Sequence, residues 1–158
     1  MPKVSSLGHI GIYVNDYALM RDFYTRMLGL TVAHESVEHS MCFLSGQPEE
    51  EDHEILLVAG REGNATLINQ ISFRVDSLET LRGFHRVFVD EGVDIASVVT
   101  HGNAASVYFN DPEGNRLEVY YRIPVDWPQP FREPFNIDQD DQGILKQIDD
   151  MTFGSVAK

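Results

Sequence analysis

Apolar and polar residues alternate over residues 7–14, and this pattern predicts a strand with one apolar face. Every second residue from Ile10 would point to that face. Apolar residues then recur at helical spacing until Gly29, with Asn15 and Asp16 as candidate N-caps. The strand and helix are therefore expected to pack against each other. The apolar stripe of this predicted helix comprises Leu19, Met20, Phe23 and Met27.

The same pattern begins again at Asn69. With a constant offset, Ile10 aligns with Ile71 and Phe23 with Phe84, so the chain contains an internal repeat. In the first copy, three further strands are predicted after the helix, at residues 30–35, 40–44 and 53–59.

The second copy contains the same elements. Its helix is predicted to begin at the capping-box residues Asp76 and Glu79 and to end near Gly92. Each copy is therefore a strand, a helix and three strands, a βαβββ module. The last three strands of the second copy are predicted at residues 93–99, 105–110 and 116–121.

The two modules predict an α+β fold. We assign residues 1–122 to the paired modules, at about 7–60 and 69–122, and residues 123–158 to a Pro-rich C-terminal tail. The tail would contain a short acidic helix capped by Asp138. We expect the modules to form one curved, mostly antiparallel sheet with helices on its convex face, which leaves a concavity on the other side.

Composition narrows the class of partner. The chain has 158 residues and a formal net charge of −13, which argues against nucleic acids and anionic membranes because both bind basic surfaces. We therefore expect a small-molecule partner. Cys42 is the only cysteine, so no internal disulfide can form, and the first residues lack the apolar core of a signal peptide. These features predict a cytoplasmic protein without a membrane-spanning segment.

The strand predicted at residues 116–121 has a carboxylate in its middle, Glu118. The preceding D-P-E-G has the residues of a hairpin turn, because Pro112 presets φ and Gly114 accepts a positive φ. Tyr108 and Glu118 are equidistant from Glu113, so we expect them to face each other across the hairpin. Glutamate is uncommon in strands and rarely buried alone, so Glu118 needs either solvent or a compensating group.

The repeat also predicts which polar side chains meet. His9 and Gln70 are equivalent positions on the first strand of each copy, opposite the face that packs on the helix. His53 begins the last strand of the first copy, and Glu118 lies in the last strand of the second. We expect the four to converge in the concavity, where they are suitable ligands for Fe(II), Mn(II), Zn(II) or Ni(II). Taken singly, His9 and Glu118 are also typical of solvent-facing strand residues, and His53 is typical of a histidine at the end of a strand.

Several segments resemble the vicinal oxygen chelate superfamily, which contains glyoxalase I, methylmalonyl-CoA epimerase, fosfomycin and bleomycin resistance proteins and extradiol dioxygenases. The resemblance covers residues 7–122 and rests on H-I-G-I-Y-V, D-H-E-I-L-L-V, N-Q-I-S-F-R-V-D and D-P-E-G-N-R-L-E-V. The region around the last segment is most similar to small, single-domain extradiol dioxygenases. The resemblance therefore implies an enzyme, usually with Fe(II), that cleaves a catechol-like aromatic diol with O₂.

The resemblance implies a ligand set by position. The first-strand histidine ligand of the family falls on His9, and its glutamate ligand falls on Glu118. The second histidine ligand falls on Gln70, which departs from the dioxygenase pattern. An amide oxygen binds Fe(II) more weakly than imidazole does.

The resemblance also assigns side chains to the substrate. The acid–base histidine of the family falls near His53, and an imidazole can take or return a proton at neutral pH. The substrate-binding tyrosine falls on Tyr108, and His101 lies near a further substrate-binding histidine. The remaining histidines, His34, His39 and His85, are interpreted as structural. Of these, His85 is expected to be an exposed helix residue.

Two other functions are compatible with the same residues. In a glyoxalase-type isomerase, epimerase or lyase, His9, His53, Gln70 and Glu118 would all bind the metal, and O₂ would not be needed. A metal-free resistance protein of the same fold would hold an aromatic ligand without turnover. We expect a small aromatic substrate as the partner and a homodimer or higher homo-oligomer as the assembly.

Overall fold

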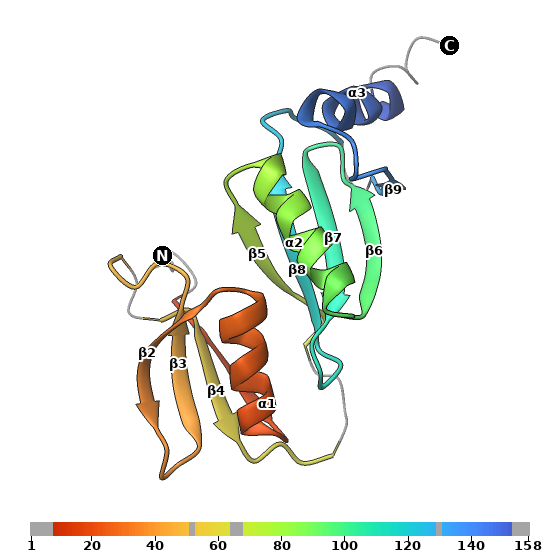
Figure 1. Ribbon diagram of the computed structural model, residues 1–158. Coiled ribbons are helices and arrows are strands. Elements are labelled where there is room, and N and C mark those ends of the chain that lie inside the picture. The colour runs from red at the N-terminus through yellow and green to blue at the C-terminus, as the bar shows by residue number, and fades with distance from the viewer. Residues whose placement is uncertain (1–7, 51–52, 64–67, 129–130, 153–158) are drawn as a thin grey trace, which may run out of the picture. The chain divides into compact units, whose positions relative to one another are not determined.

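The computed structural model describes residues 8–50, 53–63, 68–128 and 131–152. The chain divides into two compact units, Met1–Ala65 and Thr66–Lys158. Each unit contains a strand, a helix and three strands in the predicted order (Figure 1). The predicted α+β fold class, with two βαβββ modules, is therefore confirmed.

The first unit is a four-stranded sheet with one helical segment against it. Its elements are β1 (Ile10–Val14), α1 (Tyr17–Asp22), the π-helical turn η1 (Phe23–Met27), β2 (Thr31–Ser36), β3 (Met41–Ser45) and β4 (Ile55–Ala59). The strand order is β1-β4-β3-β2, with β1 and β4 parallel and the other pairs antiparallel. Because η1 follows α1 directly, the predicted first helix is continuous, but it changes from α-helical to π-helical geometry at Phe23.

The second unit repeats this arrangement and adds to it. Its elements are β5 (Ile71–Val75), α2 (Leu78–Asp90), β6 (Ile95–Thr100), β7 (Ala104–Asn110), β8 (Arg116–Arg122), β9 (Glu133–Pro134) and α3 (Asp141–Thr152). The strand order is β5-β8-β7-β6-β9, and β5 and β8 are the parallel pair. The additions, β9 and α3, both come from residues 123–158, the predicted tail, which we call the C-terminal segment.

The repeat extends to the register of the sheets. Gly11 on β1 pairs with Leu56 on β4, and Ser72 on β5 pairs with Glu118 on β8. Gly11 and Ser72 are aligned in the sequence repeat, so Leu56 and Glu118 occupy equivalent places. The joining of the two sheets into one curved sheet stays a prediction.

Side-chain caps set the starts of the first two helices. The Oδ1 atom of Asp16 accepts a hydrogen bond from the backbone N–H of Leu19 at 2.9 Å, as one of the two predicted caps of α1. The predicted cap of α2 is wrong. Ser77, not Asp76, caps this helix, because its Oγ accepts the backbone N–H of Thr80 at 3.0 Å.

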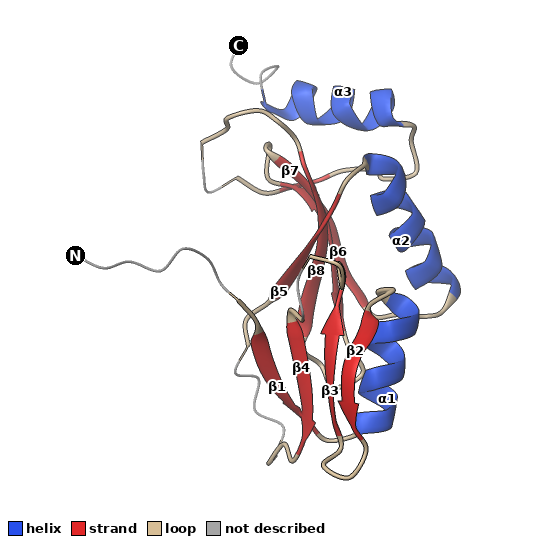
Figure 2. Cartoon of the chain, turned by 90° about the vertical axis from the view of Figure 1, so that its left-hand side faces the viewer, coloured by secondary structure: helices blue, strands red, loops and turns tan. Residues whose placement is uncertain are grey.

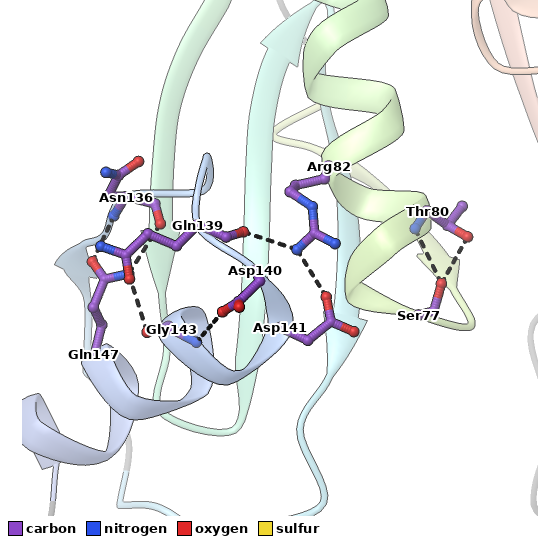
Figure 3. Close-up of polar contacts among 9 residues, drawn as sticks. All are labelled: Ser77, Thr80, Arg82, Asn136, Gln139, Asp140, Asp141, Gly143 and Gln147. Carbon is purple, nitrogen blue, oxygen red and sulfur yellow. Dashed lines mark hydrogen bonds and ion pairs between the residues drawn. The ribbon is translucent and has the colours of Figure 1, made fainter.

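Arg82 on α2 holds the start of α3 (Figure 3). Its Nη1 donates to the carbonyl oxygen of Gln139 at 3.0 Å and pairs with Oδ1 of Asp141 at 2.8 Å. The predicted cap of this helix, Asp138, is wrong. Asp140 takes that place, because its Oδ1 accepts a backbone N–H of the first turn at 2.7 Å.

One face of each sheet is covered by the helix of its unit (Figure 2). In the second unit, the rings of Phe88 on α2 and Phe109 on β7 lie 4.3 Å apart, and both are fully buried. Burial of each such ring stabilises the unit by about 1.5–3 kcal/mol. We call the face opposite the helix the far face of each sheet. In the first unit, Leu19 was predicted in the apolar stripe but is 46% exposed.

The segment after β8 lies along the edge of the second sheet. β9 pairs antiparallel with β6, so this segment becomes the edge strand. Trp127 packs against Gly102, where φ is +80° and a Cβ atom would overlap the indole ring. Only glycine fits this position, because another residue would be strained at this positive φ and its Cβ atom would overlap the indole ring. The ring of Phe131 lies 5.6 Å from that of Trp127.

Candidate active site

A row of polar side chains crosses the second sheet. Ser72 on β5 pairs with Glu118 on β8, Glu118 with Tyr108 on β7, and Tyr108 with Ser97 on β6. Tyr108 precedes Phe109, which points to α2, so alternation places Tyr108 and its cross-strand partners on the far face. The predicted pairing of Tyr108 with Glu118 across the hairpin is confirmed.

Glu118 is the buried carboxylate of this row, with 6% of its surface exposed. Its Oε2 accepts a hydrogen bond from Oγ of Ser72 at 2.5 Å and a longer one from Nε2 of Gln70 at 3.4 Å. Both donors are neutral. Among the described residues, no ion pair to Glu118 is found, although buried carboxylates usually have a cationic partner. Its surroundings therefore suit a cation.

Tyr108 is also buried, with 5% of its surface exposed. Burial raises the pKa of its phenol to about 12, and a hydrogen bond with Glu118 acts in the same direction. The guanidinium groups of Arg116 and Arg132 lower this pKa, but by less. Tyr108 therefore keeps its proton at neutral pH, and its single O–H can be directed to a ligand in place of a protein acceptor.

His101 lies beside Tyr108, so the structure brings together two residues predicted to bind substrate. Its Nε2 is 3.0 Å from the hydroxyl of Tyr108, and its Nδ1 is 2.8 Å from the carbonyl oxygen of Phe131. Because a carbonyl only accepts, Nδ1 carries a hydrogen and donates it. The C-terminal segment thus orients the imidazole of His101 against Tyr108.

Sequence reasoning missed two arginines beside Tyr108. The Cζ atoms of Arg116 and Arg132 lie 4.7 and 5.8 Å from the centre of its ring. The sequence did contain a signal for Arg116, because this residue lies two positions before Glu118 on the same strand and so shares its face. Arg132 had none, because it belongs to the segment outside the repeat.

In the first unit, the structure brings His9 and His53 together. Their rings lie 4.4 Å apart, and the ring of His53 meets that of Phe43 edge to face at 4.9 Å. The ring of His34 lies 6.0 Å from Phe43. His9 is exposed and His53 is partly buried. The first unit therefore presents imidazole groups next to an aromatic ring.

The predicted start of the last strand of the first copy at His53 is wrong. β4 begins at Ile55, so His53 lies before the strand rather than in it. Leu56 pairs with β1 as Glu118 pairs with β5, so Leu56 is the equivalent of Glu118 in the first copy.

The prediction that His85 is an exposed helix residue is also wrong. Only 17% of its side chain is exposed, and its Nδ1 lies 4.0 Å from Oδ1 of Asp138. The C-terminal segment therefore lies against this side of α2. Helical periodicity alone cannot predict such a contact.

Among its described residues, neither unit alone assembles a conventional set of metal ligands. Within the described ranges, no group of three or more His, Cys, Asp and Glu side chains is placed to hold a metal ion. The second unit brings Gln70 and Glu118 together, and the first brings His9 beside His53. A site of His9, Gln70 and Glu118 draws on both units, and this assignment stays a prediction.

Known proteins share the sequence pattern. The model of the Glyoxalase/Bleomycin resistance protein/Dioxygenase superfamily matches residues 6–119. Two curated relatives from Rhodococcus globerulus are biphenyl-2,3-diol 1,2-dioxygenase 2, 25% identical over 125 residues, and biphenyl-2,3-diol 1,2-dioxygenase 3, 29% identical over 126 residues. Each alignment covers 75% of this chain and 64% of the relative, so the chain spans less than two thirds of their length.

Solved structures share the fold. A structure of the fosfomycin resistance protein FosX from Listeria monocytogenes, complexed with Mn(II) and 1S,2S-dihydroxypropylphosphonic acid, matches with a TM-score of 0.61 and 19% identity. That match covers 75% of this chain and 90% of FosX. At this identity the likeness shows the fold alone.

Proposed function

This chain belongs to the Glyoxalase/Bleomycin resistance protein/Dioxygenase superfamily, and we propose that it is a metal-dependent extradiol-type dioxygenase that cleaves a catechol-like aromatic diol with O₂. The superfamily includes dioxygenases and other enzymes. The two curated relatives, both biphenyl-2,3-diol 1,2-dioxygenases, support the choice among these activities. We further propose a small aromatic substrate and a homo-oligomeric assembly.

The observation that carries the proposal is the environment of Glu118. This carboxylate is buried on the far face, and the described donors around it are neutral. A buried negative charge with only neutral donors is costly, and a bound cation removes that cost. A proton-bearing phenol, Tyr108, lies in the neighbouring position of the same row. A metal ligand next to a substrate donor is the combination that such an enzyme needs.

We propose that His9, Gln70 and Glu118 hold the metal. Imidazole, amide oxygen and carboxylate fit a first-row divalent ion, with Fe(II) as our choice and Mn(II), Zn(II) and Ni(II) as alternatives. The Mn(II) in the FosX structure supports a divalent metal in this fold. Gln70 already lies beside Glu118, although its Nε2 rather than its Oε1 faces that carboxylate. Rotation of the amide would present the oxygen to a metal.

The residues of the chain have separate tasks in this proposal. A divalent metal, when bound, lowers the pKa of a diol that chelates it. Tyr108 would turn its single O–H from Nε2 of His101 to a substrate oxygen, and the hydrogen bond of His101 Nδ1 to Phe131 would keep the imidazole beside it. His53 would take the proton that the diol loses, in the aromatic surroundings of Phe43.

A glyoxalase-type isomerase is the second candidate. The adjacency of His9 and His53 favours it, because in that reaction both imidazoles would bind the metal together with Gln70 and Glu118. Such an enzyme would not consume O₂. A lactoylglutathione lyase from Agrobacterium tumefaciens shares the fold, with a TM-score of 0.60 and 18% identity over 76% of this chain and 96% of the lyase.

Oxygen consumption separates the two candidates. The protein is loaded with Fe(II) without air and then mixed with O₂ and 2,3-dihydroxybiphenyl. The dioxygenase proposal predicts O₂ uptake matched by a coloured ring-fission product, and loss of both in Tyr108→Phe or His53→Ala. Absence of O₂ uptake across a panel of catechols, with turnover of a thiol adduct or an epimerisable thioester, would contradict the proposal.

Location is a separate question. No helix in the ranges that the structure describes is long and apolar enough to cross a bilayer. The cytoplasmic location inferred from the sequence stays a prediction, which fractionation of cells that express the protein can test.

A further inference from the structure

We propose that Arg116 and Arg132 form an anion-binding subsite beside Tyr108, and that the aromatic ligand of this protein carries a carboxylate. This inference rests on the proposed function for the diol and adds the class of ring substituent. It concerns the second unit alone, because all three residues belong to that unit.

The two guanidinium groups converge on one ring from different segments. Arg116 lies on β8, and Arg132 comes immediately before β9. Their Cζ atoms are 4.7 and 5.8 Å from the centre of the Tyr108 ring. A ligand that reaches the hydroxyl of Tyr108 therefore lies within reach of both cations.

Neither guanidinium is neutralised by the described part of the chain. Arg21, Arg26 and Arg82 each pair with a carboxylate, whereas among the described residues no carboxylate pairs with Arg116 or Arg132. This contrast is unexpected in a chain with 25 acidic and 12 basic residues, where acidic partners are plentiful. Two cations left together beside a binding residue indicate an anionic ligand.

The donors that remain match a carboxylate. The Nε atom of Arg116 is buried and has no hydrogen-bond partner among the described residues. Arg132 uses Nη2 to donate to Oγ of Ser97 at 2.7 Å, and this bond fixes the position of the guanidinium. A guanidinium carries five N–H donors in a planar fork, so donors remain for a bidentate contact with a carboxylate.

The subsite belongs to this chain rather than to the superfamily pattern. The family model matches residues 6–119, and Arg132 lies beyond them. The C-terminal segment that carries Arg132 is held in place by β9 on β6 and by the contact of Phe131 with His101. The segment therefore supplies one half of the subsite and β8 supplies the other.

The test compares ligands that differ only in charge. We would titrate the protein, without air, with 3,4-dihydroxybenzoate and with uncharged 3,4-dihydroxybenzamide, and measure both dissociation constants by calorimetry. The wild type should prefer the carboxylate by roughly 10-fold to 100-fold, the range for hydrogen bonds to a charged group. Arg132→Gln and Arg116→Gln should each bring this ratio close to one, while Arg132→Lys should keep part of it.

Arg86→Gln is the matched control, because it removes the same charge from an exposed position on α2. It should leave the ratio unchanged, and circular dichroism checks the fold of every variant. Equal affinity of the wild type for both ligands would overturn the inference, even if both diols are cleaved. Titration with benzoate and benzamide separates the two proposals. Arginine-dependent preference for benzoate in a protein that cleaves no diol would support the subsite and contradict the dioxygenase.

Discussion

The two sheets share one register but present different far faces. In the second sheet, one row consists of Ser72, Glu118, Tyr108 and Ser97, and in the first the equivalent row consists of Gly11, Leu56, Phe43 and His34. The second row contains a buried carboxylate and a phenol, whereas the first is largely apolar. Because strand pairing is the same, the side chains alone make this difference. The repeat thus provides a common scaffold, and one copy carries the buried charge.

The helices show a second difference. Arg21 on α1 and Arg82 on α2 are aligned in the repeat. Arg21 donates two hydrogen bonds of 2.9 Å to Glu35 on β2, whereas Arg82 binds Asp141 and the preceding C-terminal segment (Figure 3). The same position ties a helix to its sheet in one unit and to the C-terminal segment in the other. A repeated contact site can therefore be reassigned when the chain gains an extra segment.

The largest effect should come from Glu118→Ala. This change removes the buried carboxylate of the proposed metal site, so we expect the protein to lose divalent metal. Elemental analysis after reconstitution and desalting measures the result. Leu56→Ala, at the equivalent position of the first copy, should keep the metal. Full retention of metal by the Glu118 variant would show that the buried carboxylate is not a ligand.

Gln70→His should produce the next largest effect. An imidazole in place of an amide strengthens the ligand set, so we expect Fe(II) to bind about 10-fold more tightly, or about 1.4 kcal/mol. Anaerobic titration of Fe(II) into the variant and the wild type measures the change. His53→Ala is the companion variant. If His53→Ala loses the metal and Gln70→His binds Fe(II) more weakly than the wild type, the second ligand is His53.

Arg82→Ala should lower stability more than Arg21→Ala does. The side chain of Arg82 is 13% exposed and that of Arg21 is 36% exposed, so solvent screens the contacts of Arg82 less. We expect a loss of about 1 kcal/mol for Arg82 and less for Arg21, measured by urea unfolding. Lys146→Ala, which removes an ion pair that is exposed on α3, should have no measurable effect. Equal losses for both arginines would contradict this ranking.

The smallest effect concerns pH. The Arg21 guanidinium, with a further hydrogen bond from Tyr17, holds the pKa of the Glu35 carboxyl below its usual range. A pKa that is lower in the folded state means that the unfolded state binds the proton more tightly. The contribution of Glu35 to stability is therefore complete above the usual glutamate pKa and is lost as the pH falls through its folded pKa.

Urea midpoints of wild type and Glu35→Gln, compared from about pH 7 to pH 3, test this sign. The gap between the two proteins should narrow on acidification. A gap that widens, or that does not change with pH, would contradict the assigned direction.

The sequence by itself determined both modules and the central pair of the candidate site. Alternation, helical spacing and turn residues are local properties, and they predicted the strands and helices of each βαβββ module. The same counting placed Tyr108 opposite Glu118, because a short turn sets the register of a hairpin. The alignment of His9 with Gln70 also followed from the repeat.

Only the tertiary structure decided where the C-terminal segment lies. Its pairing with β6, its contact with His85 and its delivery of Arg132 to Tyr108 join residues that are far apart in sequence. No local periodicity specifies such contacts, because they depend on which surfaces remain after the modules have folded. The same reason explains His53, whose ring reaches His9 from a loop rather than from the predicted strand.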